Sequence, residues 1–411
     1  MLAVLLLSGA GAARAAQSAP SAIDARVTAI PAARLLSQPP ATLVDPARQR
    51  AAYFLARNTR PAWIAWIGFQ IVAFSWLWTS GGAARLRDLI VRAVRRPPLV
   101  RFTFGAALTL VGAAAALPAQ FYDYRILRVM GLSTERFGPW LGDWAISTLL
   151  EMIGVGAVIA VVLWLVQRTR LWWIYTMAGV LLVTLFLSLI YPIVVEPIFN
   201  HFTPLPPDRP LAQRIRELAR RSGEGDPAIY VSNLSSRTIS ANAYVVGIGP
   251  TKRIVLGDTL LDDATEPEVL FAVAHELGHD VRHDTLWGSL VAAGFFMVGI
   301  AFAVLIADRI GFRRDDDPLT RLALVGALLC VVYCVLLPFA NGYSRFIESR
   351  ADDFALAHDP DRAAGTRLFV RFADKSMQIL CPPRIVRLYW YDHPPIGTRI
   401  SRVNGQPNPC P

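Results

Sequence analysis

Long runs of apolar residues, separated by short polar links, occupy two parts of the chain. Six of these runs reach the roughly 20 helical residues that are needed to cross the hydrocarbon core of a bilayer. They lie at 62–80, 102–120, 144–166, 171–194, 285–307 and 319–340. Tryptophans lie at the ends of several runs, which is typical of the membrane interface. The pattern predicts four transmembrane helices within 62–194 and two more within 285–340.

The remaining long segments have the pattern of a folded α+β unit. Within 195–284, short β-like runs at 243–249 and 253–256 precede a helical pattern that starts at Glu266. The segment 341–411 opens with a charged helical stretch and ends in a Pro-rich tail. We therefore expect a mainly α, polytopic membrane protein whose extramembrane domain is split between 195–284 and 341–411.

The first 16 residues, MLAVLLLSGAGAARAA, form a short apolar run that ends in small residues. Such a run is typical of a signal peptide and is too short to span a bilayer. Because no Lys or Arg precedes the apolar stretch, a short uncleaved anchor is the alternative. Residues 17–61 are polar and rich in Pro and Ala, and we interpret them as an extracytoplasmic arm.

Composition and charge agree with this membrane interpretation. The 411 residues are 54% hydrophobic and only 18% charged, which excludes a disordered chain and favours lipid over nucleic acid as the surrounding partner. Lys and Arg number 41 against 31 Asp and Glu, and arginines gather in the links at 81–101, 167–170 and 308–318. Because cationic links stay in the cytoplasm, we expect 195–284 to lie outside a bacterial-type inner membrane. In that oxidising space, Cys381 and Cys410 could pair.

The residues HELGH at 275–279 carry the clearest chemistry. Positions i and i+4 of a helix differ by about 40° in azimuth and 6 Å in rise, so His275 and His279 can bind one metal ion. Glu276 would lie beside the open coordination position and act as general base toward a water molecule. This donor set predicts one catalytic zinc ion per chain.

A third ligand has to come from elsewhere in the chain. His283 continues the i+4 series but would sit too far along an unbroken helix, so we expect it to be interfacial or to support a ligand. Glu348 and Asp352 are also four residues apart, and one helix face could present Glu348 to zinc and Asp352 to the far nitrogen of a histidine. The alternative is a solvated, charged helix.

Several motifs together resemble the type I CAAX prenyl endopeptidases, which are integral-membrane zinc proteases of the gluzincin class. Besides HELGH, they are FNHFTPLP at 199–206, NAYVVGIGPTKRIVLGDTLL at 242–261, SRFIESRADDFA at 344–355 and HPPIGTR at 393–399. The resemblance covers roughly 190–400, with the motifs in the same order, and it implies a zincin-like fold for the split domain.

The resemblance also implies roles for individual residues. His275, His279 and Glu348 would bind zinc, Glu276 would be the catalytic base, and Asp352 would orient a ligand histidine. His393 and Arg399 would act on the substrate or the oxyanion, and the strand that starts at Asn242, with Ala243 and Tyr244, would pair with the substrate backbone.

We therefore expect a membrane-embedded zinc metalloendopeptidase. Its partners would be peptide or protein substrates that are membrane-associated, including prenyl-type, CAAX-like ones, and the lipid bilayer, with no nucleic acid. The alternative is a non-catalytic membrane protein with a structural zinc site, such as a chaperone or transport accessory. A structural site would be closed to water.

Overall fold

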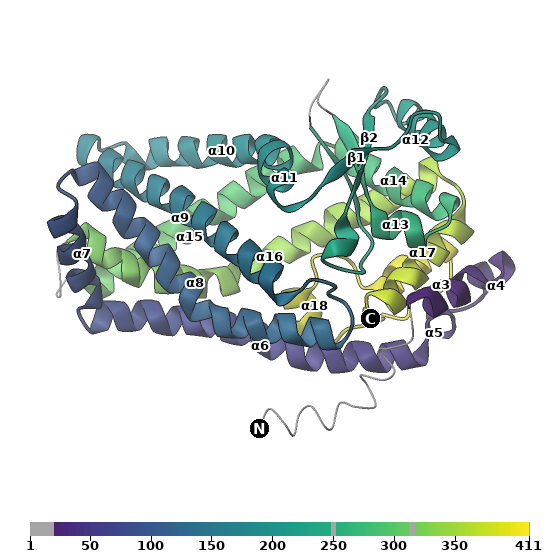
Figure 1. The fold of residues 1–411 in the computed structure, drawn as a ribbon, viewed down its shortest axis with the longest axis horizontal. Coiled ribbons are helices and arrows are strands. Elements are labelled where there is room, and N and C mark those ends of the chain that lie inside the picture. The colour runs from purple at the N-terminus through teal and green to yellow at the C-terminus, as the bar shows by residue number, and fades with distance from the viewer. Residues whose placement is uncertain (1–19, 248–251, 312–316, 411) are drawn as a thin grey trace.

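The computed structural model describes residues 20–247, 252–311 and 317–410. The predicted signal peptide or anchor at 1–16 lies outside the described residues. Six long helices run side by side along the longest axis of the molecule, and a small sheet with its helices lies at one end (Figure 1). The long helices are α6 (Pro46–Thr79), α8 (Pro97–Val129), α9 (Phe137–Arg168), α10 (Trp172–Ile190), α15 (Asp284–Gly311) and α16 (Pro318–His358).

Each long helix contains, or nearly contains, one of the predicted spans. Five of the described helices are long and apolar enough to cross a membrane, and α10 is apolar but shorter. Only 6% of the most apolar window of α9 is buried inside the protein, so its apolar side chains face outward. An outward apolar surface on helices of this length belongs in lipid. The fold is thus mainly helical, polytopic and membrane-embedded, as predicted.

Residues 17–61, which we interpreted as a polar arm, are largely helical from Pro20 onward. Residues 20–43 form three short helices, α3 (Pro20–Thr28), α4 (Ala32–Ser37) and α5 (Pro40–Leu43), which pack against the helices at the sheet end of the molecule. The physical reason is the apolar side chains spaced along this polar stretch, because Val27, Leu35 and Leu43 are almost fully buried. Helix α6 then begins at Pro46, capped by Asp45.

The sheet has four short strands in the order β1-β2-β4-β3. They are β1 (Phe202–Pro204), β2 (Ala228–Ser232), β3 (Ala243–Val246) and β4 (Arg253–Gly257). Strands β2 and β4 are parallel, whereas β1 and β3 run antiparallel to their neighbours. Among the described residues, β3 is an edge strand with no strand on its outer side.

Shorter elements complete the two ends of the molecule. At the sheet end are η1 (Tyr191–Val195), α11 (Glu196–Phe199), α12 (Pro210–Arg221), η2 (Leu234–Ser236), α13 (Asp258–Asp263), α14 (Glu266–Val281), α17 (Arg362–Lys375), α18 (Arg384–Trp390) and α19 (Ile396–Asn404). At the opposite end lies α7 (Gly82–Ala93), between α6 and α8 (Figure 1).

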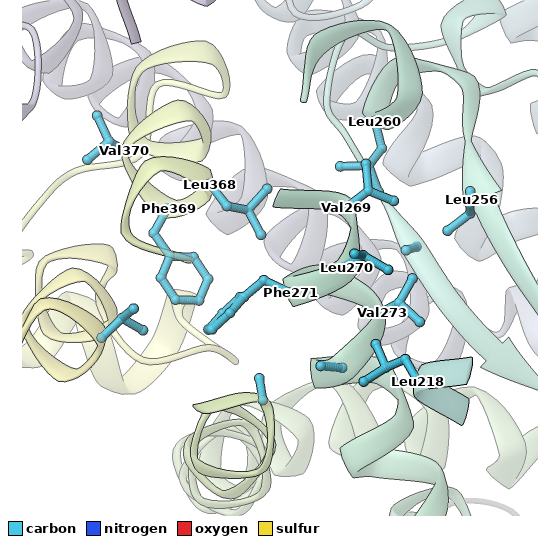
Figure 2. Close-up of a cluster of buried hydrophobic side chains, with 14 of the residues drawn as sticks. Leu218, Leu256, Leu260, Val269, Leu270, Phe271, Val273, Leu368, Phe369 and Val370 are labelled. Atoms are coloured by element: carbon cyan, nitrogen blue, oxygen red, sulfur yellow. The ribbon is translucent and has the colours of Figure 1, made fainter. Parts of the chain in front are cut away.

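The main core joins the two halves of the split domain around α14. Phe271 of α14 points at α17, where it meets Phe369 with ring centroids 5.9 Å apart in an edge-on arrangement (Figure 2). Leu256 of β4 and Leu218 of α12 are buried on the other side of the same helix. A helix buried on several sides is held firmly, so α14 is a rigid support for the histidines that it carries.

Candidate active site

Helix α14 is fixed at its N-terminal end by buried polar contacts. Thr265 and Glu268 form a capping box, in which the Thr265 backbone amide donates to Glu268 at 2.8 Å. Arg371 of α17 donates to both carboxylate oxygens of Glu268, at 3.1 and 3.2 Å. Because Glu268 and Arg371 are almost fully buried, this bidentate pair locks the start of α14 against α17.

Helix α16 leaves the membrane part and packs its last turns beside α14. The contact depends on the glycine of HELGH, since a Cβ atom on Gly278 would lie 2.9 Å from the Cβ of Phe354. Without a side chain at this position, the two helices can approach closely. Glu348 and Asp352, one turn apart on α16, are thereby brought to the histidines of α14.

Three candidate ligands converge on one point between α14 and α16. His275 Nε2 lies 3.2 Å from His279 Nε2 and 3.2 Å from Glu348 Oε2, and His279 Nε2 lies 3.4 Å from Glu348 Oε1. Two donors that each lie about 2.0–2.1 Å from a tetrahedral zinc ion are about 3.3–3.4 Å apart. Glu348 Oε2 is buried and makes no hydrogen bond with the described residues, despite its nearness to His275. The donor set and its spacing therefore fit a zinc ion.

A buried carboxylate lies behind each histidine. Asp352 Oδ1 is 3.0 Å from His275 Nδ1, and Asp284 Oδ2 is 3.0 Å from His279 Nδ1. A carboxylate at Nδ1 keeps the proton on that nitrogen and leaves the lone pair of Nε2 free for a metal. Both histidines are thus oriented in the tautomer that binds zinc.

The pair between Asp284 and His279 was not anticipated from the sequence. Helix α14 ends at Val281, and His283 adopts a positive φ of 55°, so the chain turns sharply before α15 begins at Asp284. This turn carries Asp284 back toward His279, and His283 is not part of the ligand cluster. The only sequence signal was an acidic residue immediately before the predicted span at 285–307.

Removing the Asp284 carboxylate should weaken zinc binding. We expect Asp284→Ala to lower zinc affinity by about 10- to 100-fold, because His279 loses the group that fixes its tautomer and ring orientation. Competition with a chelating dye measures this affinity. The control is Asp226→Ala, which removes an exposed carboxylate that lies 58 residues before Asp284 in the sequence. Equal zinc affinities in the two variants would contradict the role given to Asp284.

Glu276 follows the first histidine on α14 and is only partly exposed. Burial raises the pKa of the Glu276 carboxyl, and the adjacent His275 and His279 partly oppose that shift when they are charged. A carboxylate with a raised pKa binds a proton more readily, which suits a general base.

His393 and Arg399 both reach the site, but at different depths. His393 is half exposed, with Nε2 3.3 Å from Glu348 Oε1 and Nδ1 2.9 Å from Asp392. Arg399 is 8% exposed, and it donates to Asp352 through Nη2 at 2.6 Å and through Nε at 3.0 Å. Its guanidinium also lies 4.2 Å from the ring centre of Phe369. Arg399 therefore lies behind His275, with Nη2 also 4.0 Å from Glu348 Oε2.

The predicted substrate strand lies next to the HELGH helix. Strand β3 packs against α14 and contains Ala243 and Tyr244, with Asn242 just before it. The Asn242 carbonyl accepts a hydrogen bond from the Gly257 amide at 2.8 Å, which anchors the start of the strand on β4. The Tyr244 hydroxyl donates to Glu196 of α11. The outer edge of β3 has no strand partner among the described residues.

Comparisons with known proteins cover both parts of the chain. Residues 207–406 match the model of peptidase family M48, and residues 48–201 match the CAAX prenyl protease N-terminal model, described as five membrane helices. The chain is 30% identical over 326 residues to the CAAX prenyl protease 1 homolog of Dictyostelium discoideum, covering 74% of each protein. It is 29% identical over 344 residues to the uncharacterized metalloprotease YhfN of Bacillus subtilis, covering 81% of this chain and 80% of that one.

A solved structure supports the same architecture. The crystal structure of S. mikatae Ste24p superposes with a TM-score of 0.73 at 20% identity, covering 95% of this chain and 97% of that one. At this identity the likeness concerns the fold. The family match and the sequence relatives favour the protease over a non-catalytic protein with a structural zinc site. The chain belongs to peptidase family M48 and is an integral-membrane zinc metalloprotease.

Proposed function

We propose that this protein binds one zinc ion through His275, His279 and Glu348 and cleaves internal peptide bonds of membrane-associated proteins. Residues 195–284 and 341–411 would form one split protease domain, which sits on four transmembrane helices from 62–194 and two from 285–340. The observation that carries the proposal is the spacing of 3.2 to 3.4 Å among the three ligand atoms, which suits a tetrahedral ion with one position left open.

Zinc and the residues around its open coordination position would each have a separate role in hydrolysis. When bound, zinc supplies Lewis acidity, which polarises the scissile carbonyl and makes water more acidic. Glu276 takes a proton from the attacking water and passes it to the leaving amine nitrogen. His393, half exposed beside Glu348, donates a hydrogen bond to the carbonyl oxygen as negative charge develops on it.

Arg399 and Asp352 would act through His275. Arg399 binds both oxygens of Asp352, and Asp352 in turn accepts from His275 Nδ1. Because all three side chains are buried, the chain of contacts fixes the direction of the His275 ring. We thus infer a positioning role for Arg399, in place of direct contact with the oxyanion.

The substrate would bind as an extended strand along β3. The backbone around Asn242, Ala243 and Tyr244 offers main-chain hydrogen bonds, which fix a peptide with little demand on its side chains. The relative from Dictyostelium discoideum is named a CAAX prenyl protease 1 homolog, so a substrate with a prenylated C-terminal CAAX sequence is the first candidate.

Cleavage of defined peptides by the purified chain in lipid nanodiscs tests this function. We expect a quenched fluorescent peptide to be hydrolysed between internal residues, with loss of activity in a zinc chelator. Comparing farnesylated and unmodified CAAX peptides establishes whether the prenyl group is required. If no peptide is cleaved by protein that contains zinc, the endopeptidase proposal fails.

We further propose that the protease end faces the outside of the cell membrane. Cys381 and Cys410 form a disulfide near α19, and disulfides persist in oxidising compartments. The exposed arginines of the α7 region and of the link 167–170 lie at the opposite end of the long helices, where the positive-inside rule places the cytoplasm (Figure 1).

Labelling of two matched cysteine variants checks this orientation. Asp226→Cys places a thiol on the exposed surface of the protease end, and Asp88→Cys places one on α7. We expect a membrane-impermeant maleimide to label Asp226→Cys in intact cells and Asp88→Cys only after lysis. The parent for both variants carries Ser at Cys330 and Cys334. The reverse labelling pattern would contradict the proposed side.

A further inference from the structure

A large cavity lies between the membrane helices and the protease end. Its volume is about 980 Å³, and its walls come from α6, α8, α9 and α16, from the link 132–135, from the segment 237–240 and from Trp390. Two wall residues lie close in sequence to the candidate site, since Ser240 is two residues before Asn242 and Trp390 is three residues before His393. Parts of the cavity wall therefore lie only a few residues from β3 and from His393 along the chain.

The cavity wall carries an excess of negative charge. Three carboxylates line it, from Asp123, Glu135 and Asp143, against a single cation, Arg237. That cation is already engaged, with Nε 2.8 Å from Asp143 and Nη1 donating to Asn200 at 3.0 Å. Glu135 Oε1 is buried without a hydrogen bond, and it lies 3.9 Å from Arg237 Nε. Arg237 can offset only one of the three negative charges and lies closest to Asp143, so Asp123 and Glu135 are not fully compensated.

Asp123 is the more informative of the two. It lies within α8, one of the helices that is long and apolar enough to span the membrane, and it makes no hydrogen bond or ion pair with the described part of the chain. An ionisable residue in a membrane helix is costly unless it has a partner, and it commonly marks the path of a substrate or ion. Because the cavity is the space that Asp123 lines, its partner would be a ligand.

Aromatic rings make up much of the remaining wall. Trp63, Trp66, Tyr124, Trp140, Trp144 and Trp390 all line the cavity. Carboxylates among aromatic rings form a site for an organic cation, because the ring faces attract a guanidinium or ammonium group and the carboxylates accept its hydrogen bonds. The same rings can cover the apolar stem of a long side chain.

We propose that this cavity is a specificity site for an arginine or lysine side chain of the substrate, bound by Asp123 and Glu135. The inference rests on the proposed endopeptidase function and adds a charge preference to it. A substrate would lie along β3 for cleavage and place a basic residue, next to its cleaved bond or a few residues away, in the cavity.

Paired peptides that differ only in Arg or citrulline test the proposal, because citrulline keeps the shape of arginine without its charge. In wild-type protein, we expect KM to be about tenfold or more lower for the Arg peptide at one position, as for a charge-assisted hydrogen bond. Asp123→Asn and Glu135→Gln should each reduce this preference. Asp88→Asn, on exposed α7, should keep it. Equal KM values in wild type, or a preference that survives both cavity variants, would overturn the proposal.

Two further measurements distinguish the cavity site from the protease function and from lipid binding. Binding of the same peptides to wild-type protein is followed by fluorescence anisotropy. Preferential binding of the Arg peptide without any cleavage would contradict the protease function and support the cavity site. Cleavage without any preference for the Arg peptide would support the protease function and contradict the cavity site.

Lipid ammonium headgroups offer the same chemistry as a lysine side chain, so nanodiscs with and without phosphatidylethanolamine are compared. If that lipid raises KM for the Arg peptide in wild type and not in Asp123→Asn, the cavity binds the lipid headgroup in place of a substrate side chain, which would overturn the proposal.

Discussion

Replacing Glu276 by Gln is expected to abolish peptide cleavage while zinc stays bound. The amide has nearly the shape of the carboxylate but cannot accept the proton of the attacking water. The three proposed ligands are untouched, so the metal content should remain at one zinc per chain. Loss of a general base lowers kcat by about 10² to 10⁴. Single-turnover rates and metal analysis on the same purified sample measure both quantities.

The matched control for this variant is Glu217→Gln. Glu217 lies on α12, and more than half of its side chain is exposed. Its ion pairs with Arg220 and Arg221 lie on the protein surface. Such pairs contribute little to stability, so we expect kcat and zinc content to match those of wild type. A Glu276→Gln protein with full activity would remove Glu276 from the mechanism.

Replacing Glu348 by Ala should remove zinc and activity together. The carboxylate is the only proposed ligand from α16, and without it two histidines of one helix are left to hold the ion. Catalytic zinc sites use three protein ligands, so we expect zinc to be lost on dialysis and cleavage to fall to background. Circular dichroism would establish that the helices remain folded.

Asp353→Ala, five residues later on α16, is the control for this variant. Its carboxylate is exposed and pairs with Arg402 at 2.7 Å, away from the ligands. We expect zinc content and cleavage to remain near wild type, since exposed pairs contribute at most about 1 kcal/mol. If Glu348→Ala retained zinc and cleaved peptides as Asp353→Ala does, a different third ligand would be required.

Most of the membrane architecture could be predicted from the sequence, because apolar runs of span length have few alternatives. The residues at which the membrane helices begin and end were harder to predict. Asp123 was placed in a link between spans, whereas α8 continues to Val129 and carries Asp123 within the helix. Polar residues near the end of a membrane helix interrupt the apolar run without ending the helix. That difference is what revealed the unpartnered carboxylate in the cavity.

The candidate ligands could be identified from the sequence because their spacing is local. His275 and His279 are four residues apart on one helix, and Glu348 and Asp352 repeat that spacing on another. The contacts that hold these residues depend on tertiary structure. Asp284 reaches His279 only because the chain turns at His283, and Arg399 pairs with Asp352 because α19 packs beside α16.

The packing of residues 20–43 also could not be predicted from the local sequence pattern. Val27, Leu35 and Leu43 are too widely and irregularly spaced to predict one amphipathic helix, yet each is buried at the sheet end. Their partners lie in α17 and α19, more than 300 residues later in the chain. Sequence periodicity within one segment carries no information about such a distant surface.

A zinc titration of metal-free protein tests the central claim most directly. Protein stripped by a chelator is returned to buffer with increasing zinc, and peptide cleavage is recorded at each step. We predict no cleavage without metal and a linear rise in rate that stops at one zinc per chain. Cleavage by the metal-free protein, or no recovery after one equivalent of zinc has bound, would contradict the account.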